Sequence, residues 1–456
     1  MDNRDSIDFE SENISKLFSS IFFPTLLGMV FSIAFILTDG IFIGRGVGSD
    51  GLACVNLVGP LMMLFSGTGM MFAIGASVVG AIHLAKNNTK AARINITQAF
   101  LVSGCIAIGA SAIMYLASNQ ILRLLGTTEH LLPMCRQYYL WFIPTCLFTI
   151  IETIGLFVIR LDGSPRFAMM ANIIPALVNA ALDYVFIFGC RWGLMGAALA
   201  TDIGGLIGAA IVGWYMLRRV KVLHLYRLKA NLLSLRLTLR NTGYMLRVGF
   251  SGFVGEFAVS TMMIAGNYMF LKYLGEDGVA AFSVICYLFP IVFIVNNSVA
   301  QSAQPIISYN FGANRPDRVR RAFVVSLGTA AVCGLAAMLL LGLFGEPIVT
   351  AFLQRGTQAH SYATHGVKLF SAGFMILALN ISCIGYFQSI ERMRVANLIM
   401  ILRGVVLVAV CFVTLPPIIG TNGLWLAVPL AELITLVLTV ALVAWLWRKS
   451  VRSKRK

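Results

Sequence analysis

The chain consists of long apolar segments separated by short polar stretches. A helix needs about 20 apolar residues to cross a bilayer, and we count twelve segments that meet this requirement. They are residues 15–43, 52–83, 94–118, 132–160, 167–190, 194–218, 243–271, 279–309, 320–344, 362–390, 395–415 and 422–447. A segment inside hydrocarbon must satisfy its backbone hydrogen bonds internally, which favours helices. The sequence therefore predicts an all-α integral membrane protein with twelve transmembrane helices.

Charge supports this class and sets an orientation. Only 12 % of the residues are charged, against about 25 % in soluble proteins. The net charge of +16 comes from Lys and Arg in short loops and in the tail, which is typical of cytoplasmic loops and not of a nucleic-acid surface. Placing both termini inside puts 28 of the 35 basic residues on the inner side. We therefore expect a multi-pass protein of the cell inner membrane with cytoplasmic termini and no nucleic-acid partner.

The midpoint of the chain is a basic segment between two halves. We assign residues 1–14 to a cytoplasmic arm, 15–218 to a first lobe, 219–242 to a linker, 243–447 to a second lobe and 448–456 to a basic tail. Residues 218–241 mix Leu with Arg and Lys. This pattern fits an amphipathic segment at the membrane surface and equally a plain basic linker.

An internal repeat relates the two halves. The sequence GSDGLACVN at 48–56 aligns with GEDGVAAFS at 275–283, and RWGLMGAALATD at 191–202 aligns with TNGLWLAVPLAE at 421–432. An even number of spans in each unit gives both units the same polarity. The two six-helix lobes should then be related by a pseudo-twofold axis along the membrane normal, an arrangement found in transporters that bind substrate between their halves.

Departures from this repeat locate a candidate site in the first lobe. Four of its polar residues align with small or apolar residues of the second: Asp39 with Gly266, Asn179 with Ala409, Asp183 with Val413 and Thr201 with Ala431. Acids at membrane depth normally face a protein cavity or a water path. A carboxyl group buried without a partner can carry a proton near neutral pH, and carboxylate, amide and hydroxyl oxygens can also hold Na⁺. The pattern predicts a cation site and leaves H⁺ or Na⁺ open.

Other polar residues have weaker assignments. Asp202 aligns with Glu432, so symmetry favours a supporting structural role for both. Glu152 precedes Arg160 by eight residues and fits either an interior polar network or a substrate cavity. Glu256 is a candidate cavity acid for a cationic substrate.

Two prolines lie inside the helices that carry the candidate acids. Pro24 precedes Asp39 and Pro175 precedes Asp183. Proline removes a helical hydrogen bond and kinks the chain. The kinks could be static, or they could let a helix bend when the nearby acid changes its charge.

Several classes of chemistry lack their motifs. The nine cysteines include no CxxC pair, and we interpret them as small buried apolar residues. There is no P-loop, no GxSxG and no pair of histidines with metal-ligand spacing. We expect no enzyme, no cofactor and no metal site beyond a possible Na⁺ at the cation site.

The chain resembles the multidrug and toxic compound extrusion (MATE) family over essentially its full length. The resemblance rests on Pro24 with LTDGIFIGRG (37–46), NAALDYVFIFG (179–189), GLMGAALAT (193–201), ALNISCIGYFQSIER (378–392) and GLWLAVPLAELITL (423–436). It looks closest to the prokaryotic branch whose cation ligands fall on Asp39, Asn179, Asp183 and Thr201. Some members use an acid pair in the second lobe. Here Glu256 could stand for the first of these, but the tenth span offers Asn380 and no acid, so Asn380 is only a cavity candidate.

The resemblance implies antiport, in which H⁺ or Na⁺ enters as an amphipathic, often cationic, organic compound leaves. We expect such small molecules and the lipid bilayer as partners, and a monomer. An alternative is a lipid or lipid-linked oligosaccharide flippase, which would need arginines in its cavity. Arg160 and Arg403 are the candidates, and we expect both near the cytoplasmic helix ends. A channel or a receptor has less support.

Overall fold

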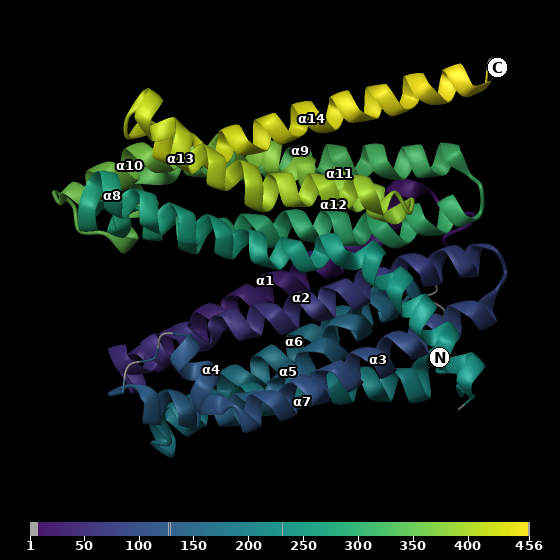
Figure 1. The fold of residues 1–456 in the computed structure, drawn as a ribbon, viewed down its shortest axis with the longest axis horizontal. Helices are drawn as coiled ribbons and strands as arrows, with labels where there is room; N and C mark the ends of the chain where they lie inside the picture. The colour runs from purple at the N-terminus through teal and green to yellow at the C-terminus, as the bar shows by residue number, and fades with distance from the viewer. Residues whose placement is uncertain (1–7, 126, 128, 230, 455–456) are drawn as a thin grey trace. The chain divides into compact units, whose positions relative to one another are not determined.

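The computed structural model describes residues 8–125, 127, 129–229 and 231–454, and it contains helices and no strand within those ranges. The first half consists of α1 (Ile14–Gly46), α2 (Ser49–Ala85), α3 (Thr89–Leu116), the short α4 (Ser118–Leu124), α5 (Leu132–Leu161), α6 (Pro165–Tyr184) continued by the π-helical turn η2 (Val185–Gly189), and α7 (Gly193–Trp214) continued by η3 (Tyr215–Arg219). The second half consists of α8 (Leu232–Gly312), α9 (Pro316–Phe352), α10 (Gln358–Ser371), α11 (Phe374–Ser389), α12 (Met393–Ile401) with η4 (Leu402–Val406) and α13 (Leu407–Ile419), and α14 (Asn422–Lys454). Figure 1 shows these helices in order along the chain.

The predicted twelve spans are confirmed when α10 and α11 are counted as one span and the long helix α8 as two. Ten described helices are long and apolar enough to cross a membrane, and α10 and α11, bent by 43°, together form another span. Helix α8 has 81 residues and is interrupted by the non-helical Gly275, so it supplies two spans. The predicted tail continues α14 as helix to Lys454, while residues 1–7 and 455–456 lie outside the described part.

The repeat is visible in the backbone. Residues with positive φ recur 227 or 228 positions apart: Gly48 with Gly275, Asn87 with Asn314, Gly163 with Glu391, and Gly193 with Gly420. Positive φ is uncommon for residues other than glycine, so four coincident pairs are not expected from unrelated segments. The loops of the two halves therefore turn at equivalent places.

Contacts divide the chain into two compact units, and the boundaries of these units differ from those of the two sequence repeats. One unit runs to Glu256 and includes Gln304–Ala322 and Ser389–Glu391, and the other contains Phe257–Ala303, Phe323–Gln388 and Arg392–Lys456. The first turns of α8 belong to the first unit because they cross α2 closely. A Cβ at Gly249 would lie 1.9 Å from the Met71 carbonyl oxygen, and one at Gly75 would lie 2.3 Å from that of Met245.

Within the first unit, α5 packs against both α2 and α7, and α1 packs along α6. The linker has no regular secondary structure over residues 220–229, and α8 begins at Leu232. Asp162, at the end of α5, accepts hydrogen bonds from the backbone N–H groups of Lys221 (2.7 Å), Val222 (2.9 Å) and Leu223 (3.0 Å). The first part of the basic segment is thus an irregular connection fixed to α5.

The N-terminal arm is tied to the loop between α8 and α9. Arg318 donates to the backbone carbonyls of Phe9 (3.2 Å) and Glu12 (2.8 Å), and Arg315 forms an ion pair with Glu10. Outside the membrane, the Ser11 hydroxyl donates to Asp8 and lowers the pKa of that carboxyl group. These contacts join two segments about 300 residues apart in sequence.

Interpreting all nine cysteines as unpaired was wrong. Cys54, near the start of α2, forms a disulfide with Cys135, in the first turn of α5, with their Cα atoms 5.0 Å apart. The two residues are separated by 81 positions and belong to no motif. Only the tertiary packing of α2 against α5 reveals this bridge.

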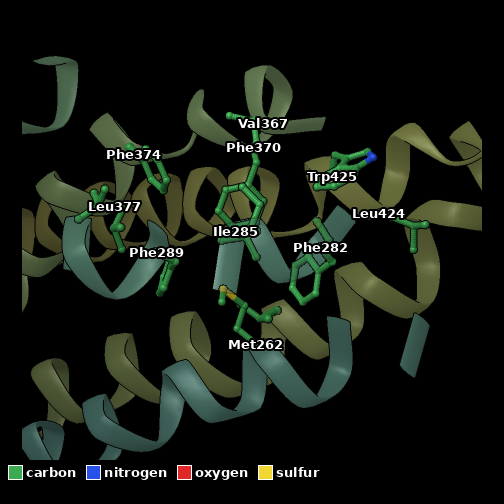
Figure 2. Packing of buried hydrophobic residues seen from close by; sticks show 14 of the residues in the cluster. Met262, Phe282, Ile285, Phe289, Val367, Phe370, Phe374, Leu377, Leu424 and Trp425 are labelled. Carbon is green, nitrogen blue, oxygen red and sulfur yellow. The ribbon is translucent and has the colours of Figure 1, made fainter. Parts of the chain in front are cut away.

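The second unit has an aromatic core (Figure 2). The Phe270 ring stacks on Phe282 with centroids 4.5 Å apart and meets the edge of Trp425 at 4.6 Å. Gly366 makes room for the indole, since a Cβ there would lie 2.1 Å from Trp425 Cδ2. Tight packing of this kind costs stability when its volume changes, so substitutions in this core should be poorly tolerated.

Candidate functional site: a cluster of oxygen ligands in the first half

The candidate site is built on the α6–α7 hairpin. Asn179 and Asp183 lie one turn apart on α6 and are 2 % and 0 % exposed. Asn179 Nδ2 donates to Thr201 Oγ1 on α7 at 3.2 Å, and Thr201 in turn donates to the Ala197 carbonyl oxygen at 3.0 Å. This order of donors uses the Asn179 amino group and leaves its carbonyl oxygen free to accept.

Gly204 sets the spacing between these two helices. A Cβ at Gly204 would lie 3.0 Å from Asn179 Cβ and 3.2 Å from the Pro175 carbonyl oxygen. Any larger residue would therefore push α7 away from the α6 face that carries Asn179. Asp183 is followed directly by the π-helical turn η2, a distortion that occurs frequently at functional sites.

Asp39 reaches this face from α1. The Asp39 and Asp183 carboxyl groups meet at hydrogen-bonding range, and two carboxylates can share such a contact only with a proton or a cation between them. No other donor in the described part of the protein reaches Asp39 Oδ1, Asn179 Oδ1 or either oxygen of Asp183. Buried acceptors normally have a partner, so these four oxygens are available to a bound cation.

The structure thus brings together all four residues predicted as cation ligands. Their donor set consists of carboxylate, amide and hydroxyl oxygens, which suits a hard cation or a proton and not a soft metal. Among the described residues there is no cluster of three or more His, Cys, Asp or Glu side chains that could hold another metal ion.

Sequence reasoning missed Tyr138, which belongs to the same region. This residue lies on α5, is 5 % exposed, and is within electrostatic range of Asp39, Asp183 and Asp202. Nothing in the sequence around Tyr138 links it to acids on three other helices, and only the packing of α5 reveals the proximity.

Asp202 and Pro24, predicted as supporting positions, differ in their surroundings. Asp202 is buried and accepts a hydrogen bond from Thr145 of α5, so it has a protein donor where Asp183 has none. Helix α1 continues without a break through Pro24. A small cavity of about 40 Å³ lies beside this proline, lined by residues of α1, α5 and α6, and Ser32 donates to Asn172 Oδ1 at 3.0 Å to hold α1 on α6.

The cavity candidates Glu152 and Glu256 lie elsewhere in the first unit. The Glu152 carboxyl carbon is 2.7 Å from where a Gly208 Cβ would be, so the acid lies against α7. Arg160 donates to the Leu156 carbonyl oxygen at 2.9 Å and lies over the Phe157 ring. Glu256 accepts from the Ser66 hydroxyl at 3.4 Å.

Asn380, the third cavity candidate, is fully buried in a polar network of the second unit. Its Nδ2 donates to Glu432 Oε2 at 2.7 Å and to the Glu432 backbone oxygen at 2.9 Å. Arg403 Nε is 2.8 Å from Glu432 Oε1, and both side chains are 2 % exposed. Asn380 therefore holds an ion pair in place in this structure.

Comparison with known proteins agrees with this architecture. The MatE family model matches residues 24–185 and 253–413. The chain is 23 % identical to the FAD transporter of Shewanella oneidensis over 93 % of both chains, and 23 % identical to the multidrug export protein MepA of Staphylococcus saprophyticus over 96 % of this chain and 95 % of that one.

Solved structures share the fold at lower identity. A multidrug resistance MATE transporter of the MOP superfamily in an outward-facing conformation superposes with a TM-score of 0.88 at 18 % identity, covering 100 % of both chains. A Vibrio cholerae MATE transporter superposes with a TM-score of 0.86 at 19 % identity, over 96 % of this chain and 97 % of that one. With the family model covering most of its length, the chain belongs to the MATE family of membrane transporters.

Proposed function

We propose that this protein is a cation-coupled antiporter that exports amphipathic, often cationic, organic compounds by alternating access. The observation that carries the proposal is the group of four buried oxygens on Asp39, Asn179 and Asp183 that no other protein donor reaches. A coupling ion must bind one conformational state more tightly than another to shift the equilibrium between them. A site shared by two separate helices meets this requirement because it exists only when α1 lies against α6.

The coupling step follows from the charges. With a proton or Na⁺ between them, Asp39 and Asp183 attract and hold α1 on α6. Without a bound proton or Na⁺, the two carboxylates repel each other, and α1 moves away from α6. Pro24 lowers the cost of bending α1 because it removes one helical hydrogen bond, and the small cavity beside it gives the helix room.

In the proposed topology, the protein lies in the cell inner membrane and both of its termini are in the cytoplasm. In that topology, the Cys54–Cys135 bridge lies at the outer helix ends, on the oxidising side where disulfides persist. The exposed Cys190, which follows η2, should therefore react with a membrane-impermeant maleimide added to intact cells. Reaction of Cys190 only after the membrane has been permeabilised would reverse the assigned orientation.

The transport proposal is tested with purified protein in liposomes, where a pH gradient and a Na⁺ gradient are imposed separately. The substrate panel should include cationic dyes and a flavin, since relatives carry the names of both a multidrug exporter and an FAD transporter. We expect one gradient to drive export, and Asp39→Asn and Asp183→Asn each to reduce it to the level of protein-free liposomes. Asp277→Asn, which removes an exposed acid, is the matched control and should transport normally. Gradient-driven export by both site variants would refute the mechanism.

A further inference from the structure

A second cavity lies away from the cation site, beside the linker. It has a volume of about 540 Å³ and is lined by the end of α2, the first turns of α3, linker residues 226–229 and 231, and the first turns of α8. We call it the linker pocket. It lies at the helix ends that the proposed topology assigns to the cytoplasm.

The linker pocket is strongly basic. Lys90, Arg227, Lys229 and Arg240 line it, together with His83, and the lining contains no Asp or Glu. None of the four Lys and Arg side chains has a carboxylate partner within the described ranges. Four like charges around one cavity repel each other, so an anion placed among them is favoured.

The other part of the lining is apolar. Leu233 and Leu237 of α8 line the pocket and are 67 % and 37 % exposed. Their neighbours Leu232, Leu235 and Leu239 are exposed as well. Leucines that alternate with basic residues at a membrane surface are typical of a segment in contact with lipid, so a ligand here could place an acyl chain along α8.

The inner wall of the pocket is fixed by polar contacts. Gln98 Nε2 donates to Thr238 Oγ1 at 2.9 Å, and Asn241 Nδ2 donates to Gln98 Oε1 at 3.1 Å. The linker is held in turn by the Tyr226 backbone N–H, which donates to Thr97 Oγ1 at 2.8 Å. The Lys90 ammonium group lies 5.8 Å from the centre of the Tyr226 ring. The basic side chains are therefore carried by a wall whose shape is set before any ligand binds.

We propose that the linker pocket binds the phosphate group of an anionic ligand, and that this ligand is a phospholipid of the inner leaflet. Arg and Lys are the side chains that recognise phosphate, and basic pockets between transmembrane helices on the cytoplasmic side bind anionic lipid headgroups. The same cations could hold a soluble phosphate, but the exposed leucines favour the lipid. Because the pocket joins α3 of the first half to the beginning of the second half, a bound lipid would also fix the linker.

The test measures binding to the full-length protein in micelles of a neutral detergent. Fluorescent phosphatidylglycerol, phosphatidylcholine of the same chain length, and inorganic phosphate as a competitor are compared. Each Lys or Arg near an anionic lipid surface contributes about fivefold to binding, so Arg227→Gln/Lys229→Gln should weaken phosphatidylglycerol binding roughly 30-fold. Arg320→Gln/Arg321→Gln removes two exposed charges of the first turns of α9, outside the pocket, and should change binding less than twofold.

Two further variants separate the sources of phosphate. Leu233→Ser/Leu237→Ser should weaken phosphatidylglycerol binding several-fold and leave competition by inorganic phosphate unchanged if the ligand is a lipid. If inorganic phosphate binds with the same dependence on Arg227 and Lys229 while phosphatidylglycerol does not bind, the source is a soluble phosphate and the lipid assignment is overturned. Equal binding of both lipids, or equal loss in the pocket and α9 variants, would overturn the site itself. A thermal unfolding curve for each variant verifies that it is folded.

Discussion

The interiors of the two halves contain equivalent acids in different surroundings. In the second half, Glu432 is neutralised by Arg403 and also accepts from Asn380. In the first half, its counterpart Asp202 accepts from Thr145, while Asp183 lies beside Asn179 with both oxygens free of other protein donors. The second half compensates its buried charge with protein groups, and the first half has buried carboxylate oxygens that no other protein donor reaches.

This difference indicates a division of roles within one repeated fold. A buried ion pair with its hydrogen bonds satisfied holds a single geometry, and the aromatic core around Trp425 packs in the same rigid manner (Figure 2). A pair of acids shared between α1 and α6 changes its interaction when a cation arrives or leaves. The repeat therefore preserves the fold in both halves, and only the first half carries the proposed switch.

The largest expected contrast is in stability. Removing one member of a buried ion pair leaves the other charge uncompensated and costs about 3–5 kcal/mol, so Glu432→Gln should lower the melting temperature strongly. Asp183→Asn removes a buried charge that lacks a protein partner, and a buried unpaired charge is itself costly, so this variant should unfold at or above the wild-type temperature. Thermal unfolding in detergent compares the two. If Asp183→Asn is the less stable variant, the contrast between the halves is wrong.

Replacing both members of the ion pair sharpens this result. Arg403→Met/Glu432→Met removes both charges, and exchanging a buried pair for apolar residues is often neutral or stabilising. We expect this double variant to recover most of the stability that Glu432→Gln loses. Asn380→Ala is tested in the background of the double variant. A double variant as unstable as Glu432→Gln would show that Arg403 and Glu432 do not act as a pair.

A smaller effect is expected from the spacing of α6 and α7. Gly204→Val places new atoms against Asn179 and the Pro175 carbonyl, and overpacking typically costs about 1–3 kcal/mol. The cation concentration needed for half-maximal transport should rise, because Asn179 is moved from Thr201. Gly213→Val on the same helix, where a Cβ meets nothing within 4 Å, is the matched control. Equal effects of the two substitutions would remove Gly204 from the site.

The smallest expected effect on cation coupling concerns Asp202. Thr145→Val removes its hydroxyl donor, and a hydrogen bond to a charged group is worth about 1.5–3 kcal/mol. The variant should lose part of its stability and keep its coupling to the same cation, since Asp202 has a protein partner and is not among the free oxygens. A change in the coupling ion would place Asp202 among the cation ligands.

Much of the fold and the centre of the candidate site could be predicted because they depend on local patterns. Apolar length predicts spans, and the i, i+4 spacing of Asn179 and Asp183 places both on one face of α6. Comparison of the two halves added Asp39 and Thr201, since symmetry aligns them with small apolar residues. The structure gathers all four around the same face.

The remaining features depend on contacts between distant segments. Cys54 and Cys135 form a bridge across 81 residues, and Asn380 and Arg403 reach Glu432 across 52 and 29 residues. The sequence shows Asn380 as a polar residue in an apolar span, which fits a cavity or a buried network equally. Tyr138 joins the acids only through the packing of α5. No periodicity encodes such pairings.

Direct measurement of cation binding tests the central claim, that the first half holds the coupling ion. On the purified protein, equilibrium binding of ²²Na⁺ and the release of protons when Na⁺ is added can both be measured. If H⁺ alone is the coupling ion, the readout is the release of protons after a step in pH. We predict saturable binding or release in the wild-type protein and in the Arg403→Met/Glu432→Met variant, and none in Asp39→Asn/Asp183→Asn. Undiminished binding or release in Asp39→Asn/Asp183→Asn, with its loss in the second-half variant, would contradict the account.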